Sequence, residues 1–375
     1  MNAPVRDPLS SALDEARLLI CAGPGGVGKT TVSAALAVAA ARAGRRTLVM
    51  TIDPARRLAD SLGIGALSDV PQQVQLPVEC AEGGGLWAMM LDVEKGLTRF
   101  VGEEVADAET AQRLTEHRLY RLVADAMHGM QEYVAVQRLY ALYRSGDFDL
   151  IVVDTPPATH ALDFLDAPTR LARFFDRRFV KWLLPATKRT GRLFRPGAAL
   201  SKMLGALLGG PFVDEMMTFF AAAEPVLQPL HDHGEAVMGL LKSHETRFLL
   251  VTRPEPRRVD EARAFEEALR PLDQQAVGFV VNRTRPYPPP GDLTDLATAL
   301  PPADADDVAA LLSDLEAFQA DQRARAEADA QICEVLGQAV GADRVRPVPH
   351  LGLDAHDLKA LTAISESLLR PSARP

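Results

Sequence analysis

From Leu18 to Thr31 the chain reads LLICAGPGGVGKTT, a short apolar run that leads into a glycine-rich loop. The next residues, Val32–Ala41, are mostly alanine and valine and are soon followed by Gly44, a pattern typical of a helix and its end. Gly23–Thr30 fits the pattern G-x-x-x-x-G-K-S/T, in which glycines let backbone N–H groups approach phosphate oxygens. We therefore predict a strand, a phosphate-binding loop and a helix.

Two side chains of this loop are predicted to act directly on ATP and Mg²⁺. Lys29 would place a positive charge between the β- and γ-phosphates, and the Thr30 hydroxyl would be a ligand of the metal ion. The simpler alternative is an ordinary glycine turn before a helix, but the strand and helix patterns on either side favour nucleotide binding. The other predicted nucleotide-binding residues of the loop are Gly25, Gly26, Val27, Gly28 and Thr31.

Charge and composition limit the classes of partner. The chain has 375 residues and a formal net charge of -9, so nucleic acid is not expected as a partner, because phosphate groups would be repelled. Residues 1–17 lack the pattern of a signal peptide, and no apolar run is long enough to span a membrane, so we expect a cytoplasmic protein.

The three cysteines, Cys21, Cys80 and Cys333, include no C-x-x-C pair. This excludes a zinc site built on such a pair and makes a structural disulfide an unfavoured interpretation. Cys21 lies at the end of the first apolar run, where we expect it to act as a small buried hydrophobic residue.

Further apolar runs of strand length are continuous rather than alternating, as expected of strands covered on both faces. Helical patterns separate them, which predicts an α/β fold with a doubly wound, mostly parallel sheet of seven strands. The six runs after the first one are Arg46–Thr51, Leu86–Leu91, Leu150–Asp154, Arg247–Thr252, Val277–Asn282 and Val345–Pro349.

Apolar residues at spacings of three and four in 114–143 and 292–341 predict two helical blocks that pack on the sheet. Residues 166–245 are too long for a simple crossover and are interrupted by prolines and glycines, so we predict an inserted helical subdomain. The predicted organisation is an N-terminal extension (1–17), an ATPase domain (18–165 and 246–360), the insert (166–245) and a C-terminal tail (361–375).

Two aspartates follow predicted parallel strands at their carboxyl ends, the edge where ligands bind in such sheets. Asp53 is predicted to orient or deprotonate a water beside the γ-phosphate, and Asp154 to hold Mg²⁺ directly or through water. Each aspartate has a structural alternative. Asp53 would cap a helix that starts after Pro54, and Asp154 would be a buried capping residue.

Together these motifs resemble the family of ArsA and tail-anchored-protein-targeting ATPases, which are dimeric P-loop ATPases related to MinD, ParA and nitrogenase iron protein. The resemblance covers nearly the whole chain, from Leu18 to about Leu358. The segments that carry it are Gly25–Thr31, Asp53–Ala55, Trp87–Asp92, Asp154–His160, Val251–Pro256 and Val280–Arg283.

The resemblance implies that Asn282 binds the adenine edge, with Pro349 in the loop that holds the base. It also implies ATP hydrolysis coupled to opening and closing of a dimer. The chain departs from the family at Pro24, where the family has a signature lysine that reaches the partner's phosphates, and it lacks the cysteines that would bind zinc or arsenite. Arg56 or Arg57 could replace this lysine in trans, or a paralogous subunit could supply it; the alternative is that both arginines are solvated helix residues.

The sequence also predicts a partner surface in the insert. Residues 170–202 contain ten basic residues and one acidic residue, a net charge of +9, with Phe174, Phe179 and Trp182 among apolar residues at helical spacing. We expect this segment to meet a hydrophobic client helix or an anionic membrane surface, unless it is a core-facing helix with a solvated basic face. A small-molecule kinase or ligase, and a positioning ATPase of the MinD or ParA type, are the alternative functions.

Overall fold

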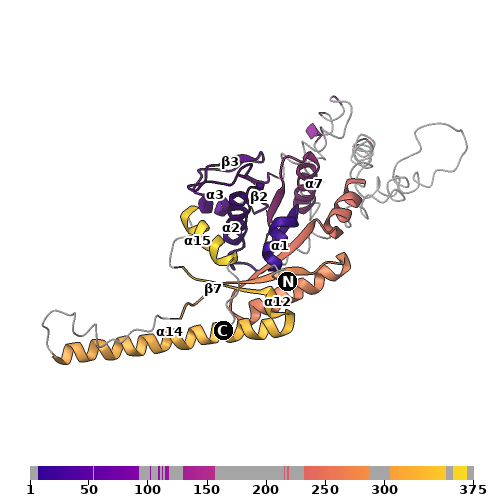
Figure 1. Cartoon of the computed structure of the whole chain (residues 1–375). Helices are drawn as coiled ribbons and strands as arrows, with labels where there is room; N and C mark the ends of the chain where they lie inside the picture. The colour runs from indigo at the N-terminus through magenta and orange to yellow at the C-terminus, as the bar shows by residue number, and fades with distance from the viewer. Residues whose placement is uncertain are drawn as a thin grey trace, which may run out of the picture.

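The computed structural model describes residues 7–53, 55–92, 130–156, 232–287, 305–351 and 358–369, together with residues 102, 109, 112, 115–117, 215 and 218. Its centre is an eight-stranded sheet in the order β3-β4-β2-β5-β1-β6-β7-β8 (Figure 1). All neighbouring pairs are parallel except β3 with β4. The predicted α/β fold with a doubly wound, mostly parallel sheet is therefore confirmed.

Seven strands coincide with the seven predicted apolar runs, to within two residues at each end. They are β1 (Leu18–Ala22), β2 (Arg46–Thr51), β4 (Gly85–Met90), β5 (Leu150–Asp154), β6 (Thr246–Thr252), β7 (Ala276–Thr284) and β8 (Val345–Pro349). The sequence did not predict β3 (Gln72–Val74), an antiparallel edge strand with two exposed glutamines. Three residues without an apolar run give no strand signal.

Side chains of β1 alternate between two hydrophobic layers. Leu18 and Ile20 belong to the layer covered by α7 (Met130–Ser145), α12 (Pro256–Leu269) and the C-terminal half of α14 (Ala305–Val340). Leu19 and Cys21 belong to the opposite layer, which contains α1 (Pro8–Glu15), α2 (Lys29–Arg42), α3 (Arg57–Leu62) and α15 (Leu358–Leu369). The strands are thus buried on both faces, which explains their continuous apolar runs.

Both ends of the described chain pack against the sheet domain. Helix α1 (Pro8–Glu15) starts at the N-cap Asp7 and buries Leu9 and Leu13 in the layer that contains α2 (Lys29–Arg42). Helix α15 (Leu358–Leu369) buries Leu361 and Leu368 beside α2 (Figure 1). The helices beyond the expected boundaries at residues 17 and 361 therefore pack in the same hydrophobic core as the sheet domain.

The end of the expected insert also belongs to the sheet domain. Residues 232–242 are helical, and Val237, Leu240 and Leu241 are buried in the same layer as α7 and α12. The remaining elements are α3 (Arg57–Leu62) and the short 3-10 helices η1 (Arg270–Leu272) and η2 (Ala342–Arg344).

The prediction that residues 292–341 form a helix that packs on the sheet holds for the C-terminal half of α14 but not for its first half. No residue in 307–325 is buried, and burial begins at Ala326. The reason is length: α14 has 36 residues, about 54 Å at 1.5 Å per residue, whereas β8 has 5 residues. Figure 1 shows the N-terminal half of α14 extending past the end of β7.

Candidate nucleotide site

The glycine-rich loop lies between β1 and α2, at the carboxyl edge of the sheet. Gly28 is the N-cap of α2 with a φ of 91°, in the left-handed region that favours glycine. A Cβ atom at Gly28 would lie 2.3 Å from Nδ2 of Asn282, and one at Gly23 would lie 2.0 Å from the backbone oxygen of Val251. Neighbouring strands β6 and β7 therefore leave no room for side chains at these two loop positions.

Lys29 is the first residue of α2 and is almost completely buried. Its Nζ donates to the carbonyl oxygens of Gly23 and Pro24, at 3.0 and 2.9 Å, and so holds the loop in a curve. Burial lowers the pKa of Lys29, and the carboxylates of Asp154 and Asp53 oppose this change. The ammonium group thus lies inside the loop that the sequence assigned to phosphate.

Asp154 ends β5 and lies beside the ends of β1 and β2 in the sheet. Its Oδ2 accepts hydrogen bonds from the hydroxyls of Thr30, at 2.7 Å, and Thr51, at 3.1 Å. Its Oδ1 is buried and has no hydrogen-bond partner among the described residues. Burial raises the pKa of Asp154 from 3.8 to about 6, although Thr30, Lys29 and Thr51 oppose the shift.

These groups fit a magnesium ion. Mg²⁺ prefers oxygen ligands and usually keeps several waters, and it is often held by one or two carboxylates plus phosphate oxygens. The unpartnered Oδ1 of Asp154 and the hydroxyl of Thr30 supply protein oxygens at one place, next to the phosphate-binding loop. A bound cation would also favour the ionised form of Asp154.

Asp53 follows β2 and is partly buried, with 24% of its side chain exposed. Its Oδ1 accepts the backbone N–H of Ala55 at 3.0 Å, and its Oδ2 lies 3.4 Å from Nη1 of Arg57. The carboxylate therefore stabilises the turn after β2, in partial agreement with the structural alternative, although the N-cap residue of α3 is Arg56. It also lies close enough to Lys29 to raise that residue's pKa.

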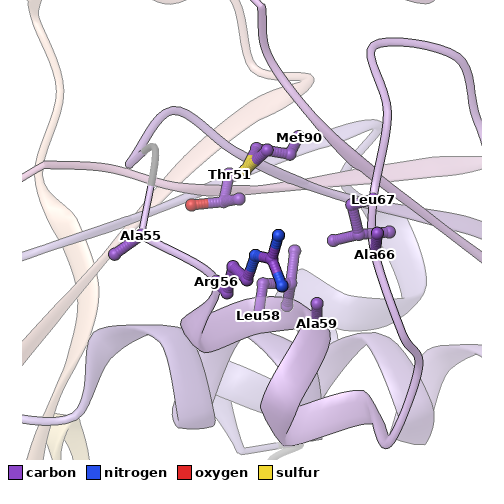
Figure 2. Close-up of a pocket in the computed structure, with 8 residues that line it drawn as sticks. All are labelled: Thr51, Ala55, Arg56, Leu58, Ala59, Ala66, Leu67 and Met90. Atoms are coloured by element: carbon purple, nitrogen blue, oxygen red, sulfur yellow. The ribbon is translucent and has the colours of Figure 1, made fainter.

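The two candidate trans cations differ in their surroundings. Arg57 forms the ion pair with Asp53. Arg56 lines a pocket between α3 and the ends of β2 and β4, where Figure 2 shows its guanidinium near Thr51 and Met90. Its guanidinium makes no hydrogen bond or ion pair with any described residue, so Arg56 is the arginine of the two whose side chain is free to bind another group.

Asn282, in β7, contacts the loop rather than projecting away from it. Its Nδ2 donates to the carbonyl oxygen of Val27 at 2.8 Å, and its Oδ1 accepts the backbone N–H of Arg283 at 2.9 Å. Pro349 ends β8 and is paired in register with Thr284, so it lies at the same edge of the sheet. Binding of an adenine edge by Asn282 and Pro349 stays a prediction.

The other predicted loop residues lie at the positions that the sequence indicated, whereas the predicted basic segment is not among the described residues. Gly25 and Gly26 are in the loop, and Thr31 is in the first turn of α2. The sequence analysis missed Thr51, whose hydroxyl holds Asp154; its position at the end of a strand next to β5 is the signal that could have found it. The basic segment 170–202 lies outside the described residues.

A glycine loop between a buried strand and a helix, with its lysine and threonine facing an aspartate on a neighbouring strand, defines a P-loop nucleoside triphosphatase fold. The chain belongs to the ArsA ATPase family, because residues 16–289 match the model of that family, which is described as an anion-transporting ATPase. The predicted family is therefore confirmed, and with it P-loop ATP binding.

Two of the three relatives described here are named as ATPases, and the third is an uncharacterized protein. The chain is 30% identical over 360 residues to the Streptomyces coelicolor protein SCO2128. This match covers 96% of this chain and 78% of the relative. It is 27% identical to ATPase GET3B of Arabidopsis thaliana, over 70% of this chain and 63% of that protein. It is 27% identical to ATPase ARSA1 of Chlamydomonas reinhardtii, over 73% of this chain and 36% of that protein. The chain thus spans less than two thirds of the latter two relatives.

Proposed function

We propose that this chain hydrolyses ATP to ADP and phosphate with Mg²⁺, and that the nucleotide state changes the contact between two subunits. The subunits are two copies of this chain, or this chain and a paralogous one. The observation that supports this most directly is the contact between Thr30 and Asp154, at 2.7 Å, beside a buried carboxylate oxygen without a partner. The membership in an ATPase family supports it independently.

Within this proposal each residue has a distinct task. Lys29 leaves the carbonyl oxygens of the loop and neutralises the charge between the β- and γ-phosphates. Mg²⁺ would supply charge neutralisation at the phosphates, with Thr30 and Asp154 as the residues that hold it. Asp53 would orient the attacking water, which requires that its carboxylate leave the ion pair with Arg57.

The output of the cycle is proposed to be the binding of a hydrophobic client helix or an anionic membrane surface. The support comes from the sequence of residues 170–202, with a net charge of +9 and interspersed aromatic residues. Within the described residues, no helix combines the length and apolar character that crossing a bilayer requires. Flotation with anionic liposomes, with and without ATP, would separate the membrane from a protein client.

Phosphate release from ATP without any second substrate tests the central proposal. We expect Mg²⁺-dependent release by the unmodified chain, none by Lys29→Ala, and ATP binding without turnover by Asp53→Asn. The alternative function, a small-molecule kinase or ligase, predicts no release until a metabolite is added. Wild-type turnover in Asp53→Asn would refute the role given to that residue, whereas no release by the unmodified chain would refute the ATPase itself.

A further inference from the structure

The part of α14 before Asp329, residues 305–328, is called the arm below. The carboxylate of Asp329 accepts hydrogen bonds from the backbone N–H and from Nη1 of Arg285, at 2.8 and 2.9 Å. Because Arg285 directly follows β7, this contact fixes the point where α14 passes the carboxyl edge of the sheet. With a rise of about 1.5 Å per residue, the arm is about 36 Å long. Figure 1 shows α14 extending past the end of β7.

The apolar stripe of α14 has two halves on one face of the helix, and only one of them is covered. Positions at alternating spacings of three and four are apolar at Val308, Leu311, Leu315 and Phe318 in the arm and again at Ile332 and Leu336, while the three positions between the halves are polar: Gln322, Arg325 and Asp329. Ile332 and Leu336 pack in the sheet core. In the arm, however, Phe318 is 61% exposed and Leu311 is 44% exposed. A stripe of this spacing is the pattern with which a helix packs on another surface.

The outer arm carries one sign of charge. Residues 305–322 contain five acidic side chains and no lysine or arginine. Two such arms packed side by side would place like charges next to each other, and an anionic membrane would repel them. The surface that fits the arm is therefore apolar and bordered by positive charge.

The carboxyl edge of β6–β8 has these two properties, and it is called the arginine edge below. Its cations are Arg257 and Arg258 in the first turn of α12, Arg283 in β7 and Arg285 directly after β7. Arg257 and Arg258 pair with Glu261 and Arg285 pairs with Asp329, whereas Arg283 is exposed without an ion pair to any described residue. The side chain of Arg257 is 89% exposed, so a second carboxylate can still approach it. Two exposed apolar residues follow the same strands, Tyr287 after β7 and Leu351 after β8.

We propose that the arm of one copy of this chain packs across the arginine edge of a second copy. In this arrangement Leu311 and Phe318 cover the partner's Tyr287 and Leu351, and the acidic residues of the arm face the partner's arginines. The outer part of the arm leads away from the arginine edge of its own domain, because α14 is a continuous helix that meets that edge at Asp329. The proposal rests on the proposed two-subunit cycle and names the surface that forms the contact.

The size of the contact is sufficient for a stable dimer. An arm about 36 Å long and about 10 Å wide covers about 360 Å² of a partner. Two arms, each counted on both surfaces, bury about 1,400 Å² in total, within the range of about 1,200–2,000 Å² that specific interfaces bury. Exposed Phe318 and Tyr287 supply the aromatic side chains that contribute most to such contacts.

Sedimentation equilibrium of the full chain, with Mg²⁺ and a non-hydrolysable ATP analogue, tests the proposal. Phe318→Asp should weaken dimerisation by about 30-fold or more, as expected for an aromatic residue at the centre of an interface. Val335→Asp is the matched control, because Val335 is 59% exposed on the same helix but outside the arm, and it should dimerise like the unmodified chain. At protein concentrations low enough that every chain is a monomer, both variants should bind a fluorescent ATP analogue with the same affinity as the unmodified chain.

Charge reversal provides a second test that does not depend on an apolar substitution. Asp314→Arg with Glu316→Arg should weaken the dimer, as should Arg257→Glu with Arg283→Glu, and all four changes together should restore it. A dimer that none of these changes affects would overturn the arm contact and leave the two-subunit cycle intact. An unmodified chain that stays monomeric in every nucleotide state would refute the two-subunit cycle itself.

Discussion

Replacing Asp154 with asparagine should remove a pH dependence of stability that is built into the site. In the folded chain without ligand, burial raises the pKa of Asp154 from 3.8 to about 6. Between these two values the unfolded chain loses the proton while the folded chain keeps it. Folding stability therefore falls as pH rises from about 4 to about 6, and is constant above that range as far as this group is concerned.

The magnitude follows from the two pKa values. A difference from 3.8 to about 6 corresponds to about 3 kcal/mol, at about 1.4 kcal/mol for each tenfold change in an equilibrium constant. The groups that face Asp154 are Lys29, Asp53, Thr30 and Thr51. Asparagine has nearly the same shape but does not titrate, so Asp154→Asn isolates the contribution of this carboxyl group.

Urea unfolding of both proteins at a series of pH values from 4 to 8 measures the effect. The stability of the unmodified chain relative to Asp154→Asn should fall by about 2 kcal/mol between pH 4 and pH 6.5, because part of the full change lies below pH 4. Mg²⁺ with ADP at 100 times its Kd should add about 2.7 kcal/mol to the unmodified chain at pH 7.5, and less at pH 5, because the metal needs the ionised carboxylate. If the free energies of unfolding of the two proteins changed with pH in parallel, the assignment of Asp154 as a buried carboxyl group that binds a cation would be refuted.

Two further predictions concern the loop and its neighbours. Gly28→Ala should destabilise the chain by about 1–3 kcal/mol, because a Cβ at a φ of 91° is strained and meets Asn282; a thermal unfolding temperature equal to that of the unmodified chain would contradict the close contact. Arg56→Ala or Arg57→Ala should lower kcat by about tenfold or more with little change in ATP affinity, as expected if one of these arginines acts in the transition state. Steady-state assays of both single variants and of the double variant, each with normal phosphate release, would exclude both arginines as replacements for the missing lysine.

The parts of the fold that the sequence predicted are those with a local signal. Parallel strands buried on both faces need continuous apolar residues, so β2, β5 and β8 begin and end where their apolar runs do. The positions of Lys29, Asp53 and Asp154 could be predicted because strands in such a sheet end at one edge.

Other features depend on contacts that the local sequence does not record. Asn282 binds the carbonyl of Val27, which is 255 residues away in the chain, so no local pattern indicates this contact. In the sequence Thr51 looks like an ordinary strand residue, because it meets Asp154 only when β5 pairs with β2. The stripe of α14 has the same period on its covered and uncovered halves, so periodicity shows that an apolar face exists but not what covers it.

The outer edge of β8 has a consequence for how this sheet avoids fibrous growth. Successive N–H groups of a strand point to opposite neighbours, and the N–H of His350 donates inward to Thr284. The odd-numbered positions therefore face outward, and two of them are Pro347 and Pro349, which have no N–H to donate. The third outward position is Val345, whose N–H already donates to the carbonyl oxygen of Ala342, so a strand from another chain would find no free donor at these three positions. Together with the short, glutamine-bearing β3 at the opposite edge, these prolines make the eight-stranded sheet a poor template for further strands.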